Sequence, residues 1–138
     1  MLDKERILTR IADIEQYTIA LSKFMPNNLK EYNDSNNVIK AACERYLQLI
    51  NDLQIEVLAL VYKGLELGIV GEDISLINTF ESKINKKTLE KLKQRRALRN
   101  MLVHAYYNAD YNKEVFAQSS NVNDVLDFIK QIKNIISK

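Results

Sequence analysis

The sequence predicts an all-α protein, an antiparallel bundle of four to five helices that forms a single domain over residues 1–138. Three observations support this fold class. Apolar residues recur every three or four positions along most of the chain, as they do on the buried face of a helix. Only 3 Gly and 1 Pro interrupt the 138 residues. Apolar residues make up 46% and charged residues 28% of the chain, a balance typical of a soluble globular domain.

The first predicted helix spans residues 3–24. It stops at Met25-Pro26, because proline cannot continue the hydrogen-bond pattern of a helix. Its apolar side chains fall on one stripe, formed by Ile7, Ile11, Ile14, Leu21 and Phe24. The following residues 26–37, PNNLKEYNDSNN, have the Asn, Asp and Ser content of a loop whose last residues cap the next helix.

A long second helix is predicted from residue 38 to residue 67, where Gly68 closes it. We expect it to form the centre of the core. Its apolar face comprises Ala41, Ala42, Tyr46, Leu49, Leu53, Val57, Leu60 and Val61. A short third helix is predicted within residues 71–85, behind an Asp73 cap.

A fourth helix is predicted over residues 86–108, and a fifth, capped helix within residues 119–138. The apolar positions of the fifth helix are Val125, Phe128, Ile129, Ile132 and Ile136. The pattern contains no internal repeat, which indicates one bundle rather than a repeat array.

Several classes of site are excluded by residue counts. The chain has 1 Cys and 1 His, so it forms no internal disulfide and no zinc site of the usual ligand types. We expect Cys43 to be unreactive core and the protein to use no metal or other cofactor. The first residues lack the apolar stretch of a signal peptide, and no apolar run reaches membrane-spanning length, so we expect a cytoplasmic protein without membrane association.

Positive charge is concentrated between Lys83 and Arg99, where eight Lys and Arg residues face a single acid, Glu90. A charged run of this kind is either a solvated helix face or a surface that neutralises the phosphates of a nucleic acid. Because the run leads directly into the histidine-containing segment, we favour the phosphate-neutralising surface. The residues predicted to contact the nucleic acid are Lys91, Lys93, Arg95 and Arg96.

The segment after the basic run, RNMLVHAYYNAD, contains the only histidine. At 100° per residue, Asn100 and His104 share one stripe of a helix, and Arg99 and Tyr106 share the adjoining stripe. The opposite side of the helix carries apolar residues that can pack into the bundle: Leu98, Met101, Leu102 and Ala105. Spacing alone leaves two interpretations open, a hydrogen-bonded structural histidine or a proton-transferring one.

The same segment resembles the signature of HEPN-domain proteins of the HepT-like toxin group. In that signature an arginine and a polar residue precede three mostly apolar residues, a histidine, any residue and a tyrosine. Arg99, Asn100, His104 and Tyr106 each match it, and the likeness covers roughly residues 36–136. The resemblance implies a homodimeric HEPN-type bundle and a metal-independent ribonuclease. It also implies a minimal nucleotidyltransferase antitoxin as partner, which attaches AMP to Tyr106.

The residues themselves suit this chemistry. RNA carries its own nucleophile, the ribose 2′-OH, and a histidine with a pKa near 6.5 can move protons at neutral pH. In this interpretation His104 transfers protons, Arg99 stabilises charge at the scissile phosphate and Asn100 orients the reacting groups. Cleavage needs both a base and an acid, so we expect a homodimer to bring two histidines together. The alternative is a noncatalytic helical module that binds a nucleotidyltransferase.

Overall fold

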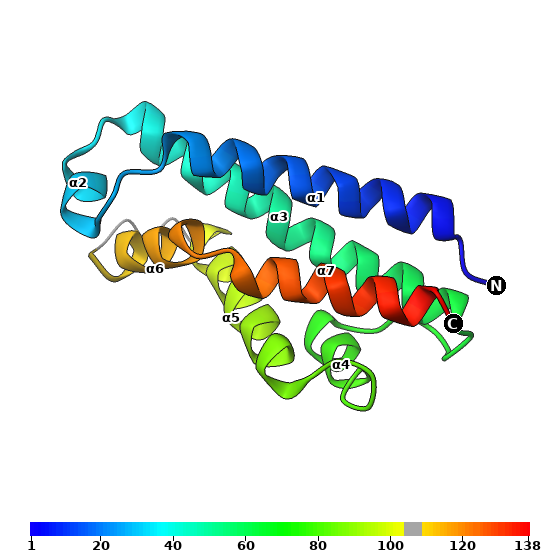
Figure 1. Ribbon diagram of the computed structural model, residues 1–138. Helices are drawn as coiled ribbons and strands as arrows, with labels where there is room; N and C mark the ends of the chain where they lie inside the picture. Colours follow the sequence, from blue (N-terminus) through cyan, green and yellow to red (C-terminus); the bar gives the residue numbers. More distant parts are fainter. Residues whose placement is uncertain (104–108) are drawn as a thin grey trace.

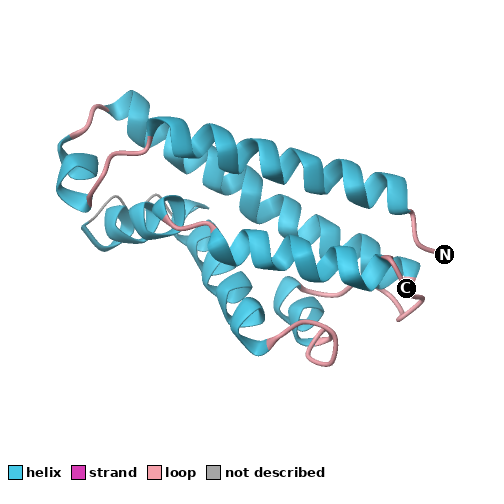
Figure 2. Cartoon of the chain, in the orientation of Figure 1, coloured by secondary structure: helices cyan, strands magenta, loops and turns pink. Residues whose placement is uncertain are grey.

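The computed structural model describes residues 1–103 and 109–138. Within these residues the chain forms seven helices and no strand (Figures 1 and 2). In chain order they are α1 (Lys4–Phe24), α2 (Leu29–Asp34), α3 (Asn37–Gly64), α4 (Asp73–Asn78), α5 (Lys86–Val103), α6 (Ala109–Ser120) and α7 (Asn123–Ile136). The predicted all-α fold class is confirmed.

The long helix α3 lies at the centre of the bundle and contacts α1, α4, α5 and α6. Helix α1 packs along it and α7 packs against α1 and α5, whereas α5 leaves the bundle at a steep angle (Figure 1). Both termini lie at one end of the bundle, and α2 and α6 lie at the other. No helix in the described part of the chain is both long and apolar enough to cross a lipid bilayer.

Helix α1 follows its prediction closely. The side chain of Asp3 caps it by accepting a hydrogen bond from the Arg6 backbone N–H at 3.1 Å. The helix ends before Met25, whose backbone is extended, as expected for a residue that precedes proline. Four of the five predicted stripe residues are buried, namely Ile7, Ile11, Ile14 and Leu21, and Phe24 packs against the core at its edge.

Helix α3 ends three residues before its predicted end and buries a different face. Its buried residues are Cys43, Leu47, Ile50, Asn51, Gln54, Val57, Leu58 and Val61. Of the predicted face, only Val57 and Val61 are buried; Ala41 is exposed, and the rest are partly buried. The predicted face omitted three buried apolar residues of the neighbouring stripe, Leu47, Ile50 and Leu58. It also omitted Asn51 and Gln54, polar residues in buried positions that a hydrophobic pattern assigns to solvent.

Two short helices were not predicted. Helix α2 lies within the predicted loop 26–37; Asn28 caps it by accepting from the Glu31 N–H at 2.9 Å, and Tyr32 anchors it in the core. Helix α6 lies in a segment for which no helix was predicted. Asp73 is the first residue of α4 rather than its cap, since Glu72 precedes it and makes no side-chain cap.

Helix α7 buries all five of its predicted apolar residues, although no side chain caps it. The prediction for Cys43 also holds in one respect, because the thiol is fully buried. Burial raises the pKa of the Cys43 thiol to about 11, with a smaller contribution from the charge of Glu44. At neutral pH the residue is therefore a protonated, weakly nucleophilic part of the core.

Candidate functional site

Helix α5 carries most of the residues predicted to form the functional site. Three buried leucines, Leu89, Leu92 and Leu98, fix it to the rest of the bundle. The basic residues between them do not share one face, because successive residues on a helix are about 100° apart. They divide into a side facing α6 and α7 and a side facing α3 and α4.

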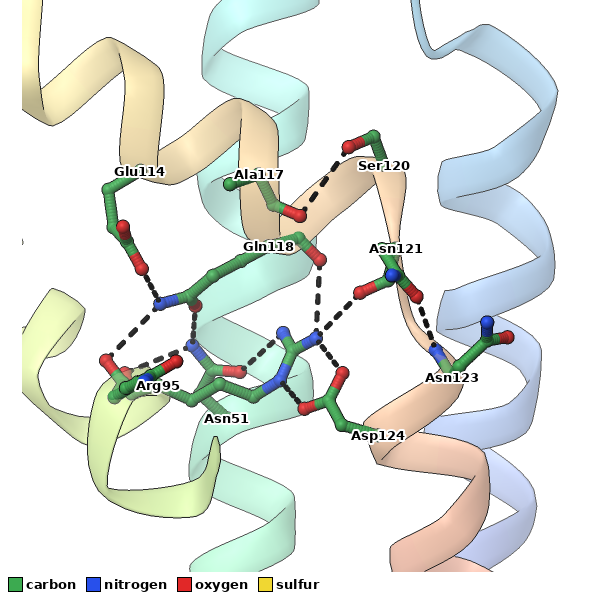
Figure 3. Close-up of polar contacts among 10 residues, drawn as sticks. Asn51, Arg95, Glu114, Ala117, Gln118, Ser120, Asn121, Asn123 and Asp124 are labelled. Atoms are coloured by element: carbon green, nitrogen blue, oxygen red, sulfur yellow. Dashed lines mark hydrogen bonds and ion pairs between the residues drawn. The ribbon is translucent and has the colours of Figure 1, made fainter. Parts of the chain in front are cut away.

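Arg95 points into the first of these sides and is 3% exposed (Figure 3). Its Nε and Nη2 donate to the two carboxylate oxygens of Asp124 at 2.7 and 2.9 Å. Nη2 also donates to the backbone carbonyls of Gln118 and Asn121, both at 3.2 Å. Nη1 lies 3.4 Å from the side-chain oxygen of Asn51. These bonds join α5 to α3, to α7 and to the end of α6.

The environment of Arg95 corrects one sequence-based expectation. A guanidinium that is buried and bonded to five oxygens is not presented to a phosphate, so Arg95 is not retained among the residues expected to contact RNA. The hydrophobic pattern gave no signal for its partners, because Asn51, Gln118 and Asp124 are polar residues distant in the sequence. Arg95 instead has a structural role, because it links α5 to α3, to α7 and to the end of α6.

Arg96 and Arg99 lie on the other side of α5, next to two acids. Nε of Arg96 donates to Oδ2 of Asp73 at 3.1 Å. Nη1 of Arg99 lies 3.7 Å from the same oxygen, and its Nε lies 3.4 Å from Oδ1 of Asp52. The Arg99 side chain is 48% exposed. A permanently charged, half-exposed guanidinium is suited to binding an anion.

Lys91 and Lys93 reach the surface on opposite sides, about 200° apart around the helix. Lys91 and Lys87 lie at a groove of about 510 Å³ between α5, α6 and α7, whose lining includes Arg95 and Asp124. Lys93 lines a smaller hollow of about 370 Å³ together with Lys86 and other residues of α4 and α5. The basic side chains therefore point to several sides of α5 and do not form one basic face.

The remaining motif residues are only partly within the described chain. Asn100 belongs to α5, and Leu98 and Met101 pack toward the core as predicted. His104, Ala105 and Tyr106 lie outside the described residues, as does the predicted end of the fourth helix at residue 108. Among the residues that are described, no three His, Cys, Asp or Glu side chains are grouped so that they could hold a metal ion.

The chain matches the model of one protein family and is similar to solved structures. A family model described as "Ribonuclease HepT-like" matches residues 7–132. No curated protein matches the sequence. Among solved structures, the chain is similar to the tri-AMPylated HEPN toxin of Shewanella oneidensis in complex with MNT antitoxin. The two are 21% identical with a TM-score of 0.79, over 97% of this chain and 99% of that one.

A second similar structure is YutE from Bacillus subtilis, a cytosolic protein of unknown function. It is 17% identical, with a TM-score of 0.78 over 96% of this chain and 90% of that chain. At these identities the likeness to both structures establishes the fold. The HEPN-type architecture expected from the motif is thereby confirmed.

The buried position of Arg95 predicts a large loss of stability in Arg95→Ala. Removing one partner of a buried ion pair leaves Asp124 without its charge partner, which typically costs about 3–5 kcal/mol. Urea denaturation followed by circular dichroism measures the change. Lys91→Ala, four residues away on the same helix but exposed, is the control and is expected to stay within about 0.5 kcal/mol of the unsubstituted protein. Equal midpoints for the two variants would contradict this role.

Proposed function

The chain belongs to the HepT-like ribonuclease family, and on this basis we propose that it is the metal-independent endoribonuclease toxin of a toxin–antitoxin pair acting in the cytoplasm. The observation that carries the proposal is the family match over residues 7–132, within which Arg99, Asn100, His104 and Tyr106 satisfy the motif. The fold shared with a HEPN toxin supports it.

The proposed reaction uses the ribose 2′-OH as nucleophile. His104 acts as the proton-transferring group, because imidazole can both accept and donate a proton near neutral pH. Arg99 binds the scissile phosphate and stabilises the charge that develops there, for which its half-exposed guanidinium on α5 is suited. Asn100, next to Arg99 in the sequence, orients the reacting groups by hydrogen bonding.

Cleavage by this route needs one group to deprotonate the 2′-OH and another to protonate the departing 5′-oxygen. Each chain has a single histidine. We therefore propose a composite site in which two chains of a homodimer each contribute His104, with their α5 helices facing across the two-fold axis. The RNA strand is held by cations that α5 presents at the surface, namely Lys91, Lys93 and Arg96.

The proposed partner is a minimal nucleotidyltransferase antitoxin that attaches AMP to Tyr106. The Shewanella oneidensis HEPN toxin, which is tri-AMPylated and in complex with MNT antitoxin, supports this pairing. Tyr106 follows His104 by two residues, so an AMP group there adds bulk and negative charge close to the catalytic histidine. Such a modification disfavours binding of the RNA phosphate backbone.

The catalytic assignment predicts that His104→Ala loses about 10²- to 10⁴-fold in the rate of RNA cleavage, the usual effect of removing a general acid or base. Arg99→Ala is expected to be similarly damaging through lost charge stabilisation. Wild-type products should end in 2′,3′-cyclic phosphate, and EDTA should leave the rate unchanged. Gel analysis of end-labelled RNA measures the cleavage rates of the variants, the chemical form of the product ends and the effect of EDTA.

Circular dichroism is the control for this prediction, since both variants should keep the helical signal of the wild type. Unaltered cleavage by His104→Ala, or its outright unfolding, would give the histidine a structural role. Wild-type protein that cleaves no RNA, yet binds the nucleotidyltransferase, would establish the noncatalytic binding module instead.

The surface cations predict a salt-dependent affinity for RNA. Replacing Lys91, Lys93 and Arg96 together with Ala should weaken binding and reduce the slope of log affinity against log salt by about 2, since each lost phosphate contact on a single strand contributes about 0.7. Fluorescence anisotropy with labelled RNA measures the slope. The matched control removes three exposed cations of α1, Lys4, Arg6 and Lys23. Equal slopes in the two triple variants would show that the α5 cations are solvated and do not contact the RNA.

The modification predicts a mass increase of the wild-type protein when it is incubated with ATP and a cognate minimal nucleotidyltransferase. Intact-mass spectrometry should find the adduct on wild type and on Tyr107→Phe, but not on Tyr106→Phe. The modified protein should also bind RNA more weakly, because the added phosphate repels the RNA backbone. An adduct that persists in Tyr106→Phe would place the modification at another residue.

A further inference from the structure

The guanidinium of Arg99 is held between carboxylates from two other helices. Oδ1 of Asp52, on α3, lies 3.4 Å from its Nε. Oδ2 of Asp73, the first residue of α4, lies 3.7 Å from its Nη1. The two acids contact different nitrogens, so together they restrict both the direction of the side chain and the plane of the guanidinium.

The two carboxylates are themselves fixed. Oδ2 of Asp73 also accepts a hydrogen bond from Nε of Arg96 at 3.1 Å, which secures the start of α4 to α5. Oδ1 of Asp52 is shielded from solvent and has no hydrogen-bond partner within the described chain, although the Asp52 side chain is 42% exposed. The positive charge of Arg99 compensates this oxygen. Shielding a carboxylate oxygen from water without a hydrogen bond costs folding free energy, which indicates a functional role for its contact with Arg99.

We infer that Asp52 and Asp73 are positioning residues that hold Arg99 ready for the scissile phosphate, an inference that rests on the proposed ribonuclease function. A free arginine side chain samples many rotamers and must lose that freedom whenever it binds a phosphate. Carboxylates that hold the guanidinium in advance remove this cost from the reaction. The half of the side chain that stays exposed is then available to the substrate.

The same two acids have an opposite effect on substrate binding. Their negative charges lie within 4 Å of the arginine nitrogens and repel an approaching phosphate. Removing one of them should therefore strengthen the binding of RNA while slowing its cleavage. Changes of KM and kcat in these directions are not expected from a residue that only stabilises the fold, because loss of folded protein lowers kcat without tightening binding.

The main variant is Asp52→Asn, which keeps the shape of the side chain and removes its charge. We expect kcat for RNA cleavage to fall roughly 10- to 100-fold, the scale of a small misplacement of a catalytic group, while KM falls. The control is Glu90→Gln, which removes the same charge from an exposed position of α5. It should leave kcat unchanged. Wild-type kcat in Asp52→Asn would overturn the inference, and Asp73→Asn provides an independent repeat.

A second measurement does not depend on cleavage. The ¹H–¹⁵N signal of the Arg99 Nε group, assigned by its absence from Arg99→Lys, should be protected from solvent exchange in the wild type and lose that protection in Asp52→Asn and Asp73→Asn. Undiminished protection in both variants would overturn the inference even if kcat had changed. If the wild type cleaves no RNA, the proposed function fails by itself, and this signal still decides whether the two carboxylates hold Arg99.

Discussion

The ion pair between Arg95 and Asp124 is the contact on which the arrangement of the site depends. Burying an arginine requires the removal of its hydration, and the attraction of one carboxylate offsets that cost only when the remaining donors are also satisfied. Here two backbone carbonyls and the side chain of Asn51 complete the set. Because these acceptors come from α3, α7 and the end of α6, one side chain ties α5 to three other parts of the bundle, in addition to the packing of its buried leucines.

Adjacent arginines of α5 consequently have different roles. Arg95 faces the interior, whereas Arg96 lies about 100° further around the helix and reaches the acids at the surface. Arg99 lies near Arg96 on that surface side, and the two share Asp73. Anchoring and the proposed anion binding thus involve residues within one five-residue stretch of α5. A rigid helix suits such a combination, since functional groups on regular elements are held more accurately than groups on loops.

Local patterns were sufficient to predict much of the fold. The apolar stripes of α1 and α7 identified their buried faces, because among the buried residues of these two helices only Thr18 of α1 is polar. The predicted face of α3 omitted Asn51 and Gln54, which are buried polar residues, as well as three buried apolar residues of the neighbouring stripe. Short helices such as α2 depend on contacts made after folding, here the burial of Tyr32, and their sequences resemble loops.

The site was less predictable than the fold. The motif selected Arg99 as a candidate from its spacing to His104, a purely local signal. Charge counting could not separate Arg95 from its exposed neighbours, because burial depends on partners more than twenty residues away. Asp52 gave no local signal either, as it lies 47 residues before the arginine that it contacts. Such pairs become visible only when the packing of α3, α4 and α5 is known.

The placement of both termini at one end of the bundle has a practical consequence (Figure 1). An affinity tag or a fluorescent protein joined to either terminus would project from the end opposite α2 and α6. Chain ends that lie at the same end of a domain also suit insertion of that domain into a host protein. The bundle can therefore be immobilised or fused through either terminus without covering the α2 and α6 end.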